Sequence, residues 1–574
     1  MAFFKKNPSF LMTVSSFDGT DCTKKVTNSI SSAEYMRNFR ITENGKLQKR
    51  YGYKKLDGIQ TGEDFYLSGD LLFYRNGKTI NAYDISTESI CASYELDVRE
   101  KTVYFTFGGN VYVICEEEAV VFKDGVFLKA ELYVPTVAIT CPPSGGGTIF
   151  ESLNLLCDMA SLSYSPDGEA NVYNLPSSAI GVVSVTENGK TVTKDKYTFD
   201  LSKKCVTFSY VPEGGVADSL KITFRMSDTE VTKYLLRGRS FCVYGGDFDS
   251  RVFAYGGDNI IYYSDITSHG PDPLYFPAEN YITVGDGTYD VTALVRHYST
   301  LAVFTSGDAW YISPSSVDYD GYTKPTFPIY PLNGNVGTVR GGAALVDNSP
   351  LTVNSDGVYL WRSSTVRDER NAKCISDKVE PLLHSDFLKT AKVFDHQAKK
   401  ELWIYNFGVV MIYNYALDVW YAFDGIDAAD IYEYNGEALF VNPAGVYLFD
   451  PAVYTDNGSA YRAVWQSGFA NFGRIDKKRL YMIYASLIPE PCSNVKITLV
   501  PNSGERISVG QNGEFSNVVL DFSALDFSNF SFECEGRPTL TRHRIRLRRF
   551  DSIRLIIENS EPDGRATVER VVIN

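Results

Sequence analysis

The sequence contains none of the short motifs on which common catalytic and metal-binding sites are built. It has no G-x-S-x-G nucleophile elbow and no phosphate-binding glycine loop. Its five histidines show neither H-x-x-x-H nor H-E-x-x-H spacing; they are His269, His297, His384, His396 and His543. A zinc site or a serine hydrolase is therefore not supported. We predict no catalytic residue, no metal site and no cofactor.

Long hydrophobic runs and paired cysteines are also missing. No run of 18 apolar residues occurs, and the sequence start MAFFKKNPSF has no apolar core of a secretory signal. The ten cysteines include no C-x-x-C pair, and a disulfide framework would be unusual in so large a chain. We expect no membrane-spanning segment, no secretion by the ordinary route, and reduced thiols in a protein assembled in a cytoplasm.

A long helical pattern is absent too, and the composition favours strands. Aromatic residues make up 14% of the chain, with 39 Tyr and 35 Phe, and there are 45 glycines. This composition is typical of all-β proteins. A chain of 574 residues is too long for one hydrophobic core, so we expect two to four domains. The net charge of −14 bears on solubility and partners rather than on the fold.

Short alternating runs separated by turn residues recur along the chain, most clearly between Arg251 and Ile312. There GGDN, SHGPDP, GDGTYD and SGD separate runs in which apolar and polar residues alternate. This pattern is typical of half-buried strands joined by tight turns, and a repeated meander builds a sandwich or a propeller. Hairpin dipeptides also occur at 76–77, 108–109 and 124–125. A spacing of about 35 to 45 residues per four strands suits propeller blades, although no blade signature recurs from which to count them.

Changes in local composition and residue pattern along the chain predict its domains. The breaker cluster TCPPSGGGT (140–148) marks a boundary, and the residues after it alternate Thr and Val in short strands. We predict an all-β fold: a β-propeller with an inserted small β-sandwich domain and a β-rich platform formed by the N- and C-terminal segments. The predicted parts are the N-terminal basic segment 1–60, the first propeller strands 61–140, the inserted sandwich 141–230, the remaining blades 231–457 and the C-terminal platform region 458–574.

The first 60 residues are basic, with eleven Lys/Arg against five Asp/Glu, a net charge of +6 that leaves about −20 for the remainder. Ser-Ser-Ala-Glu resembles a helix cap, so a short helix is predicted from Ser31 to Phe39. After this helix, Asn44-Gly45 predicts the turn of a hairpin between two strands. Lys46, Lys49 and Arg50 follow, and they suit either a solvated strand edge or a positively charged surface for docking or phosphate.

A second basic cluster lies near the C-terminus, in TLTRHRIRLRRF. Arg542, Arg544, Arg546 and Arg548 recur at every second residue, with Ile545 and Leu547 between them. In a strand this spacing places the four guanidinium groups on one face and the two apolar side chains on the other. Such a row of like charges repels unless it meets bulk water, neighbouring acids in salt bridges, phosphate, or an acidic partner surface. The sequence leaves these alternatives open.

Two other functions are compatible with a propeller. A carbohydrate-binding propeller of a fibre or surface protein would use exposed aromatic rings as sugar platforms. A propeller glycoside hydrolase would place paired carboxylates in its centre. The sialidase-type Asp-box is only approached by Ser355-Asp356-Gly357 with Trp361, because the spacing differs. We expect Trp361, Trp403 and Trp420 to pack in the core rather than to form a ligand platform.

Several blocks of the sequence resemble one family. NFRITENGKLQKRYGYKKL is similar to the N-terminal signature of tail nozzle proteins (tail tubular protein B-like) and packaged-DNA stabilisation proteins of short-tailed, podovirus-like bacteriophages. The similarity continues in the same order, from residue 38 to 558, through these blocks: NIIYYSDI with DPLYFPAENYITVGDGTYDVTALVRHYSTLAVFTSGDAWYI, VMIYNYALDVWYAF, AYRAVWQSGFANFG, KKRLYMIY and RHRIRLRRFDSIRLIIEN. None of these blocks is catalytic. The inserted region is the part least expected to follow the family.

The resemblance implies a structural protein of the virion tail, assembled in the host cytoplasm. Six copies would form a tube below the portal and its adaptor ring, with a propeller in each subunit. The tube would retain packaged double-stranded DNA without sequence specificity and conduct it during ejection. It would also attach tail fibres, a needle or receptor-binding proteins. On this interpretation the candidate contacts with DNA or with a neighbouring ring are Lys46, Lys49, Arg50, Arg542, Arg544, Arg546 and Arg548.

Overall fold

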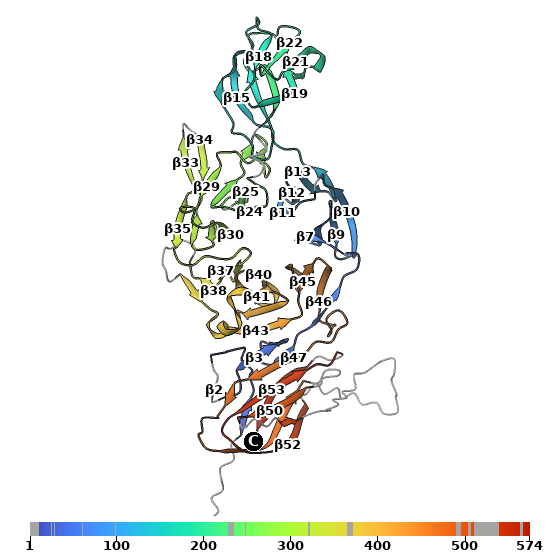
Figure 1. Ribbon diagram of the computed structural model, residues 1–574, viewed down its shortest axis with the longest axis vertical. Helices are drawn as coiled ribbons and strands as arrows, with labels where there is room; N and C mark the ends of the chain where they lie inside the picture. The colour runs from blue at the N-terminus through green and yellow to red at the C-terminus, as the bar shows by residue number, and fades with distance from the viewer. Residues whose placement is uncertain are drawn as a thin grey trace, which may run out of the picture. The chain divides into compact units, whose positions relative to one another are not determined.

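The computed structural model describes most of the chain, and almost all of its regular structure is β-strand (Figure 1). This confirms the predicted fold class at the level of secondary structure. The helical elements are short: η1 (Lys194–Lys196), η2 (Asp377–Leu382), α2 (Ser385–Leu388) and η3 (Gln397–Lys399). The described residues are 11–23, 26–27, 29–59, 61–97, 99–116, 118–227, 235–246, 248–319, 322–363, 371–488, 495–502, 507–509, 539–562 and 566–574.

Among these residues, no helix has the length and apolar character needed to cross a membrane.

The chain divides into two compact units. The first unit contains Met1–Gly62, Val339–Arg362 and Ala372–Asn574, and the second contains Glu63–Thr338 and Ser363–Asn371. The first unit therefore combines both ends of the chain with part of its middle.

Three antiparallel sheets of four strands follow one another in the first unit. Their strand orders are β36-β37-β38-β39, β40-β41-β42-β43 and β44-β45-β46-β6. The strands are β36 (Ala343–Val346), β37 (Ser349–Asn354), β38 (Gly357–Trp361), β39 (Ala372–Cys374), β40 (Lys392–His396), β41 (Glu401–Asn406), β42 (Val409–Asn414), β43 (Val419–Asp424), β44 (Asp430–Tyr434), β45 (Glu437–Asn442), β46 (Gly445–Asp450) and β6 (Gly52–Lys55). Trp361, Trp403 and Trp420 are buried in these sheets, as predicted.

The third of these sheets is completed by a strand from the start of the chain. β6 pairs antiparallel with β46, so that Gly52 lies opposite Asp450 and Lys55 lies opposite Tyr447. The ring of Tyr53 makes an edge contact with that of Phe440, with ring centres 4.8 Å apart. A non-local pairing of this kind ties residues 52–55 to strands that lie about 400 positions later in the sequence.

The two ends of the chain also form two further sheets of the first unit, here called the first and second terminal sheets. The first has the order β4-β5-β54-β49-β52, with β1 on β54. The second has the order β2-β48-β53-β47-β3, with β50 on β53 and β51 on β50. The strands are β1 (Met12–Val14), β2 (Val26–Thr27), β3 (Ala33–Arg37), β4 (Phe39–Ile41), β5 (Leu47–Lys49), β47 (Ala463–Ser467), β48 (Phe469–Ala470), β49 (Lys478–Leu487), β50 (Lys496–Pro501), β51 (Ile507–Val509), β52 (Thr539–Phe550), β53 (Ile553–Asn559) and β54 (Thr567–Ile573).

One hydrophobic core joins the two terminal sheets. Ile545, Leu547 and Val571 of the first sheet belong to the same buried cluster as Trp465 and Ile557 of the second. On β53, buried and half-buried residues alternate strictly along the strand, which is the period expected of a strand with one face in a core. The two sheets therefore pack face to face.

The second unit contains four more antiparallel sheets of four strands. Their orders are β10-β9-β8-β7, β11-β12-β13-β14, β24-β25-β26-β29 and β30-β31-β32-β35, with the separate hairpins β27–β28 and β33–β34. The strands are β7 (Glu63–Ser68), β8 (Leu71–Asn76), β9 (Thr79–Asp84), β10 (Ser89–Glu95), β11 (Thr102–Phe107), β12 (Asn110–Cys115), β13 (Glu118–Lys123), β14 (Val126–Lys129), β24 (Ser240–Tyr244), β25 (Arg251–Tyr255), β26 (Ile260–Tyr263), β27 (Ile266–Thr267), β28 (Gly270–Pro271), β29 (Tyr281–Thr283), β30 (Val291–His297), β31 (Thr300–Thr305), β32 (Ala309–Ile312), β33 (Ser315–Tyr319), β34 (Tyr322–Thr326) and β35 (Ile329–Asn333).

Between β14 and β24, the second unit has two more sheets that share a core. Their orders are β16-β15-β17-β23-β19-β20 and β18-β22-β21. Tyr164 and Phe224 of the larger sheet are buried together with Tyr173 and Phe208 of the smaller one. The strands are β15 (Thr136–Cys141), β16 (Thr148–Ile149), β17 (Met159–Tyr164), β18 (Val172–Asn174), β19 (Ala179–Glu187), β20 (Lys190–Thr191), β21 (Tyr197–Asp200), β22 (Cys205–Phe208) and β23 (Leu220–Met226).

The helix predicted from Ser31 to Phe39 is absent, because this segment forms strands. β3 pairs with β47, with Met36 opposite Trp465, and the chain then turns at Asn38, whose φ of 57° is left-handed. A single left-handed residue cannot continue a right-handed helix. Hydrogen bonds to a strand more than 400 residues away therefore override the local cap signal. The hairpin predicted at Asn44-Gly45 is present, since β4 and β5 pair.

Gly52 provides a test of the β6 contact. An ideal Cβ on Gly52 would lie 2.0 Å from the carbonyl oxygen of Thr455, so alanine cannot fit without backbone movement. We expect Gly52→Ala to lower the unfolding free energy by about 1–3 kcal/mol. Tryptophan fluorescence in urea measures this change, because Trp361, Trp403, Trp420 and Trp465 all lie in the first unit.

The matched control for this prediction is Gly458→Asn. Gly458 has a φ of +85° and no atom within 4 Å of an ideal Cβ, and asparagine tolerates this conformation. The control should change the unfolding free energy by less than about 0.5 kcal/mol. Equal midpoints for Gly52→Ala and the unmodified chain would contradict the close approach of these two segments.

Candidate functional site

All seven basic residues predicted from the sequence lie within the first unit, and six of them fall into a buried or an exposed group. Lys49 and Arg50 have side chains that are almost fully buried. Lys46 is half-buried, and its Nζ lies 3.8 Å from Oε1 of Glu569. The four arginines of β52 are all exposed. The two groups therefore lie in different environments.

Arg50 is held by a complete set of acceptors inside the first unit. Its Nη1 and Nη2 donate to Oδ1 and Oδ2 of Asp456 at 2.8 and 2.6 Å. Nε donates to Oδ1 of Asn38 at 2.9 Å, and the remaining N–H groups donate to the carbonyl oxygens of Tyr51 and Asp424. All five donors of the guanidinium are satisfied. Burial would lower the pKa of Arg50, but the contacts with Asp456 outweigh it and raise the pKa, so the side chain stays charged.

Lys49 precedes Arg50 in the chain, and its side chain is fully buried. Its Nζ donates to Oδ1 of Asn559 at 2.8 Å and to the carbonyl oxygen of Glu561 at 2.9 Å. The ring of Tyr461 lies 4.4 Å from Nζ of Lys49 and 3.9 Å from Cζ of Arg50. Burial, together with the positive charge of Arg50, lowers the pKa of Lys49 to about 8. The sequence predicted a surface contact for Lys49 and Arg50, whereas the structure gives both a place in the core, where their charges are satisfied internally.

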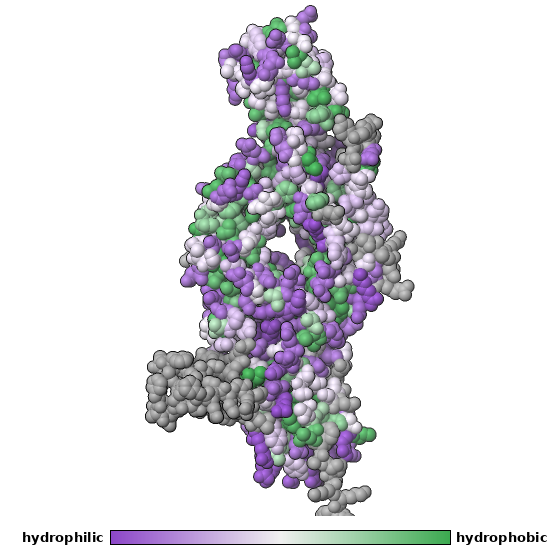
Figure 2. All heavy atoms as spheres, turned by 180° about the vertical axis from the view of Figure 1, so that it is seen from behind, coloured by the Kyte–Doolittle hydropathy of each residue, from purple (hydrophilic) through white to green (hydrophobic). Residues whose placement is uncertain are grey.

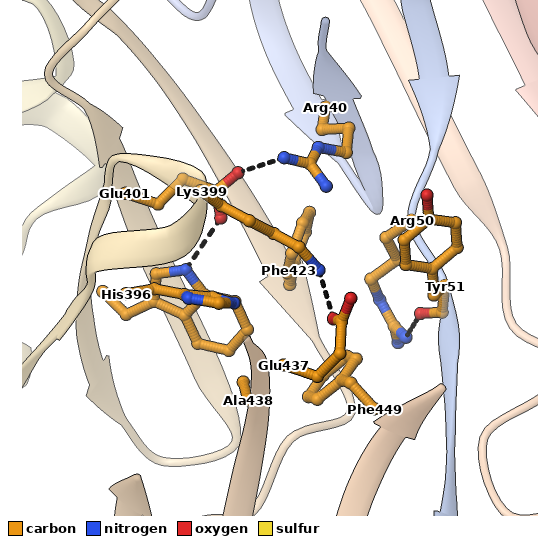
Figure 3. A pocket seen from close by; sticks show the side chains of 11 residues that line it. Arg40, Arg50, Tyr51, His396, Lys399, Glu401, Phe423, Glu437, Ala438 and Phe449 are labelled. Atoms are coloured by element: carbon orange, nitrogen blue, oxygen red, sulfur yellow. Dashed lines mark hydrogen bonds and ion pairs between the residues drawn. The ribbon is translucent and has the colours of Figure 1, made fainter. Parts of the chain in front are cut away.

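A small polar cavity lies next to Arg50 (Figure 3). Glu401 is 1% exposed and accepts hydrogen bonds from Nη2 of Arg40 at 2.6 Å, the hydroxyl of Tyr421 at 2.7 Å and Nε1 of Trp403 at 2.9 Å. Both of its oxygens are therefore occupied. The cavity is lined by Arg40, Arg50, Tyr51, His396, Lys399, Glu401, Trp403, Phe423, Glu437, Ala438 and Phe449.

The size of this cavity limits what it can hold. Its volume of about 20 Å³ is enough for one water molecule. Lys399 and Glu437 form an ion pair at its side, and Nδ1 of His396 lies 3.1 Å from Oε2 of Glu433. Nε2 of His396 is buried and has no partner among the described residues, so a water here would satisfy it. Burial lowers the pKa of His396. The charged side chains around the cavity are thus engaged in ion pairs.

The exposed group forms a row on β52, at the end of the first terminal sheet in the described chain. Arg542, Arg544, Arg546 and Arg548 are exposed, whereas Ile545 and Leu547 between them are only 3% and 4% exposed. This is the arrangement that the period of two predicted. We call these four residues the arginine row.

The neighbouring strand β49 continues the same surface. Arg479 lies directly opposite Arg548, Met482 opposite Arg544 and Tyr484 opposite Arg542. Nε of Arg542 lies 3.0 Å from Sδ of Met482. Two β-bulges interrupt the register of the pair and leave Tyr481 50% exposed. The surface therefore contains guanidinium, tyrosine and methionine side chains side by side.

The arginine row has no internal counter-ion among the described residues. Eleven other arginines there form ion pairs: Arg40, Arg50, Arg75, Arg225, Arg237, Arg239, Arg251, Arg296, Arg462, Arg474 and Arg554. Neither the arginine row nor Arg479 forms such a pair with a described carboxylate. Of the alternatives left open by the sequence, salt bridges to neighbouring acids are thus not observed in the described part of the chain.

The sequence did not reveal the partners of Lys49 and Arg50, nor the arginine that lies beside the arginine row. Asp456, Tyr461 and Asn559 lie far from Lys49 and Arg50 in the sequence, and no local pattern connects them. The sequence could have indicated an exposed position for Arg479, because Arg479-Leu480-Tyr481 begins an alternating run like that of β52. Only the strand register shows that it lies opposite Arg548.

Two other features of the described chain do not form a site. The described residues contain no group of three or more His, Cys, Asp or Glu side chains placed to hold a metal ion. The inserted pair of sheets exposes apolar side chains such as Phe150 and Ile180, but Figure 2 shows the hydrophobic areas of this region scattered among hydrophilic ones. The arginine row and its neighbours on β49 are therefore the candidate site.

Comparisons with known proteins found similar solved structures alone. No family model and no curated protein matches it. Among solved structures, it is similar to the computationally designed Ika8 protein (TM-score 0.34, 10% identity, 70% of this chain and 99% of that chain). It is also similar to BamB from Moraxella catarrhalis (TM-score 0.33, 11% identity, 70% and 98%) and to Raptor from Chaetomium thermophilum (TM-score 0.31, 11% identity, 72% and 29%). Likenesses at these TM-scores carry no argument about function.

The buried Lys49 generates a pH-dependent prediction. Its pKa is about 8 in the folded chain and about 10.4 when unfolded, so between these values the unfolded state binds more protons. The unfolding free energy that Lys49 contributes must therefore rise with pH. Relative to Lys49→Met, the unmodified chain should gain about 2 kcal/mol between about pH 7.5 and pH 9.5.

Urea unfolding followed by tryptophan fluorescence at the two pH values measures this gain. Taking the difference between the two chains cancels the titration of the tyrosines. A difference that stays constant with pH would show that Lys49 titrates normally and is not buried as described.

Proposed function

We propose that this chain is a structural subunit of the tail nozzle of a short-tailed bacteriophage. In this proposal six copies form a tube below the portal and its adaptor ring, retain packaged double-stranded DNA and conduct it during ejection. Fibres, a needle or receptor-binding proteins attach to the tube. The observation that carries the proposal is the series of sequence blocks that resemble this family, in the same order, from residue 38 to 558.

The sheet organisation supports the propeller that the family resemblance implies. The described residues form seven antiparallel sheets of four strands, and in most of them neighbouring strands are also consecutive in the chain. Sheets of this kind are the units of β-propellers. We propose that the seven sheets are its blades and that β6, which joins the sheet of β44–β46, links the two ends of the ring. The two terminal sheets would form the platform, and the inserted pair of sheets would be a decoration.

The distribution of charge also supports the proposal. Residues 61–457 contain 29 Lys/Arg and 52 Asp/Glu, a net charge of −23, whereas the two terminal segments together contain 27 Lys/Arg and 18 Asp/Glu, a net charge of +9. A channel lined by acidic residues repels DNA phosphates, so that the duplex slides rather than sticks. The basic terminal segments would then serve ring contacts.

Electron microscopy of the purified chain tests the proposal. The chain would be imaged alone and after mixing with the portal–adaptor complex of the same particle, with the portal lacking its adaptor as the control. We expect a six-fold tube on the adaptor and none on the bare portal. A monomer that ignores the adaptor would contradict the proposal and would favour the carbohydrate-binding or glycoside hydrolase alternatives.

A further inference from the structure

In the described part of the chain, the outer edge of the first terminal sheet combines a strand without an outer partner and arginines without an ion pair. β52 pairs with β49 on one side, and no described strand pairs with its other side. A strand of twelve residues thus presents backbone N–H and C=O groups, together with the arginine row. Long open edges invite pairing with another chain unless something controls them.

We propose that β52 is a docking edge for an extended acidic segment of a partner protein. The segment would pair with β52 as an added strand and present carboxylates at alternate positions to the arginine row. Addition of a strand to a sheet edge is an established mode of peptide recognition, in which backbone hydrogen bonds provide affinity and alternate side chains provide specificity.

The first argument is electrostatic. Arg479 and Arg548 lie directly opposite one another on neighbouring strands, and like charges in this position destabilise a sheet. Neither arginine forms an ion pair with a described carboxylate, although eleven other arginines of the described chain do. Carboxylates supplied from outside would remove the repulsion and form charge-assisted hydrogen bonds.

The second argument is geometric. Alternate residues of an antiparallel strand are about 6.8 Å apart, so the guanidinium groups of the arginine row recur at this interval. An added strand has the same repeat. Glutamates at every second position of that strand would therefore each lie beside one arginine, on the same face, along the whole row.

The third argument concerns selectivity. A second copy of β52 would bring arginine against arginine, so the row disfavours pairing of the chain with itself and favours an acidic strand. The surrounding surface has the composition of protein interfaces, in which arginine, tyrosine and methionine are enriched and lysine is depleted. Tyr481, Met482 and Tyr484 lie beside the row, and the segment Arg542–Arg549 contains no lysine. These features favour a protein strand over the phosphate backbone of DNA.

This inference is independent of the proposed function. It concerns the chemistry of one sheet edge and requires neither a six-fold ring nor an adaptor. A peptide-binding experiment on the full chain can therefore fail while the nozzle proposal stands, and the reverse also holds.

The probe is a fluorescent twelve-residue peptide of alternating glutamate and threonine. Its control is a peptide of the same composition in which the glutamates stand in adjacent pairs, which keeps the charge but removes the alternation. Binding to the full chain is measured by fluorescence anisotropy at physiological salt. We expect the alternating peptide to bind at least about tenfold more tightly than its control.

The matched variants separate the arginine row from overall charge. Arg544→Glu with Arg546→Glu should weaken binding of the alternating peptide by about a hundredfold, because two carboxylates then face glutamates. Lys194→Glu with Lys203→Glu makes the same charge change on exposed lysines of the inserted pair of sheets and should leave binding unchanged. If the first variant does not fold, Arg544→Gln with Arg546→Gln replaces it, with an expected loss of about tenfold.

Three results would overturn the proposal. Equal binding of the two peptides would show attraction by charge without strand pairing. Displacement of the peptide by an equal charge concentration of a short DNA duplex would show a general polyanion site. Absence of binding to the folded chain would show that the edge accepts no acidic strand.

Discussion

The guanidinium of Arg50 is the constraint on which the arrangement of the first unit depends. A buried charge costs several kcal/mol unless its hydrogen bonds are complete, and here all five donors have acceptors. These acceptors come from the turn at Asn38, the end of β43 and the loop at Asp456. The start of the chain, a sheet of its middle and the entry to its C-terminal part must therefore meet at one point.

Near the other end of the chain, arginine side chains are exposed instead of buried. The arginine row also consists of guanidinium groups on a strand, but its alternation with Ile545 and Leu547 directs the charges to solvent and the apolar side chains to the core. A buried guanidinium requires a complete set of partners, because an unpaired buried charge is costly, whereas an exposed guanidinium has no such requirement. The basic residues described here thus lie in two environments, paired in the core of the first unit or exposed on β52.

Local patterns in the sequence predicted local structure well. Alternation and hairpin dipeptides identified strands such as those joined at Asn76-Gly77 and the two faces of β52, because both depend on neighbouring residues only. The helix expected at Ser31–Phe39 was wrong because β3 depends on β47, which lies far away in the sequence. The burial of Lys49 was missed for the same reason, since Asn559 and Glu561 supply its acceptors. The sequence alone therefore predicts that a basic run such as Lys49-Arg50 lies on the surface, because its distant partners are not visible in it.

The division of basic residues between two environments can be tested by one comparison of stability. The unfolding free energy of the first unit would be measured by urea and tryptophan fluorescence for Arg50→Met and for the combined glutamine substitutions of the arginine row. The account predicts that Arg50→Met loses about 3–5 kcal/mol, because the carboxylate of Asp456, whose side chain is only 11% exposed, loses its ion pair, while the row variant changes by less than about 0.5 kcal/mol. A neutral Arg50→Met, or a strongly destabilised row variant, would contradict it.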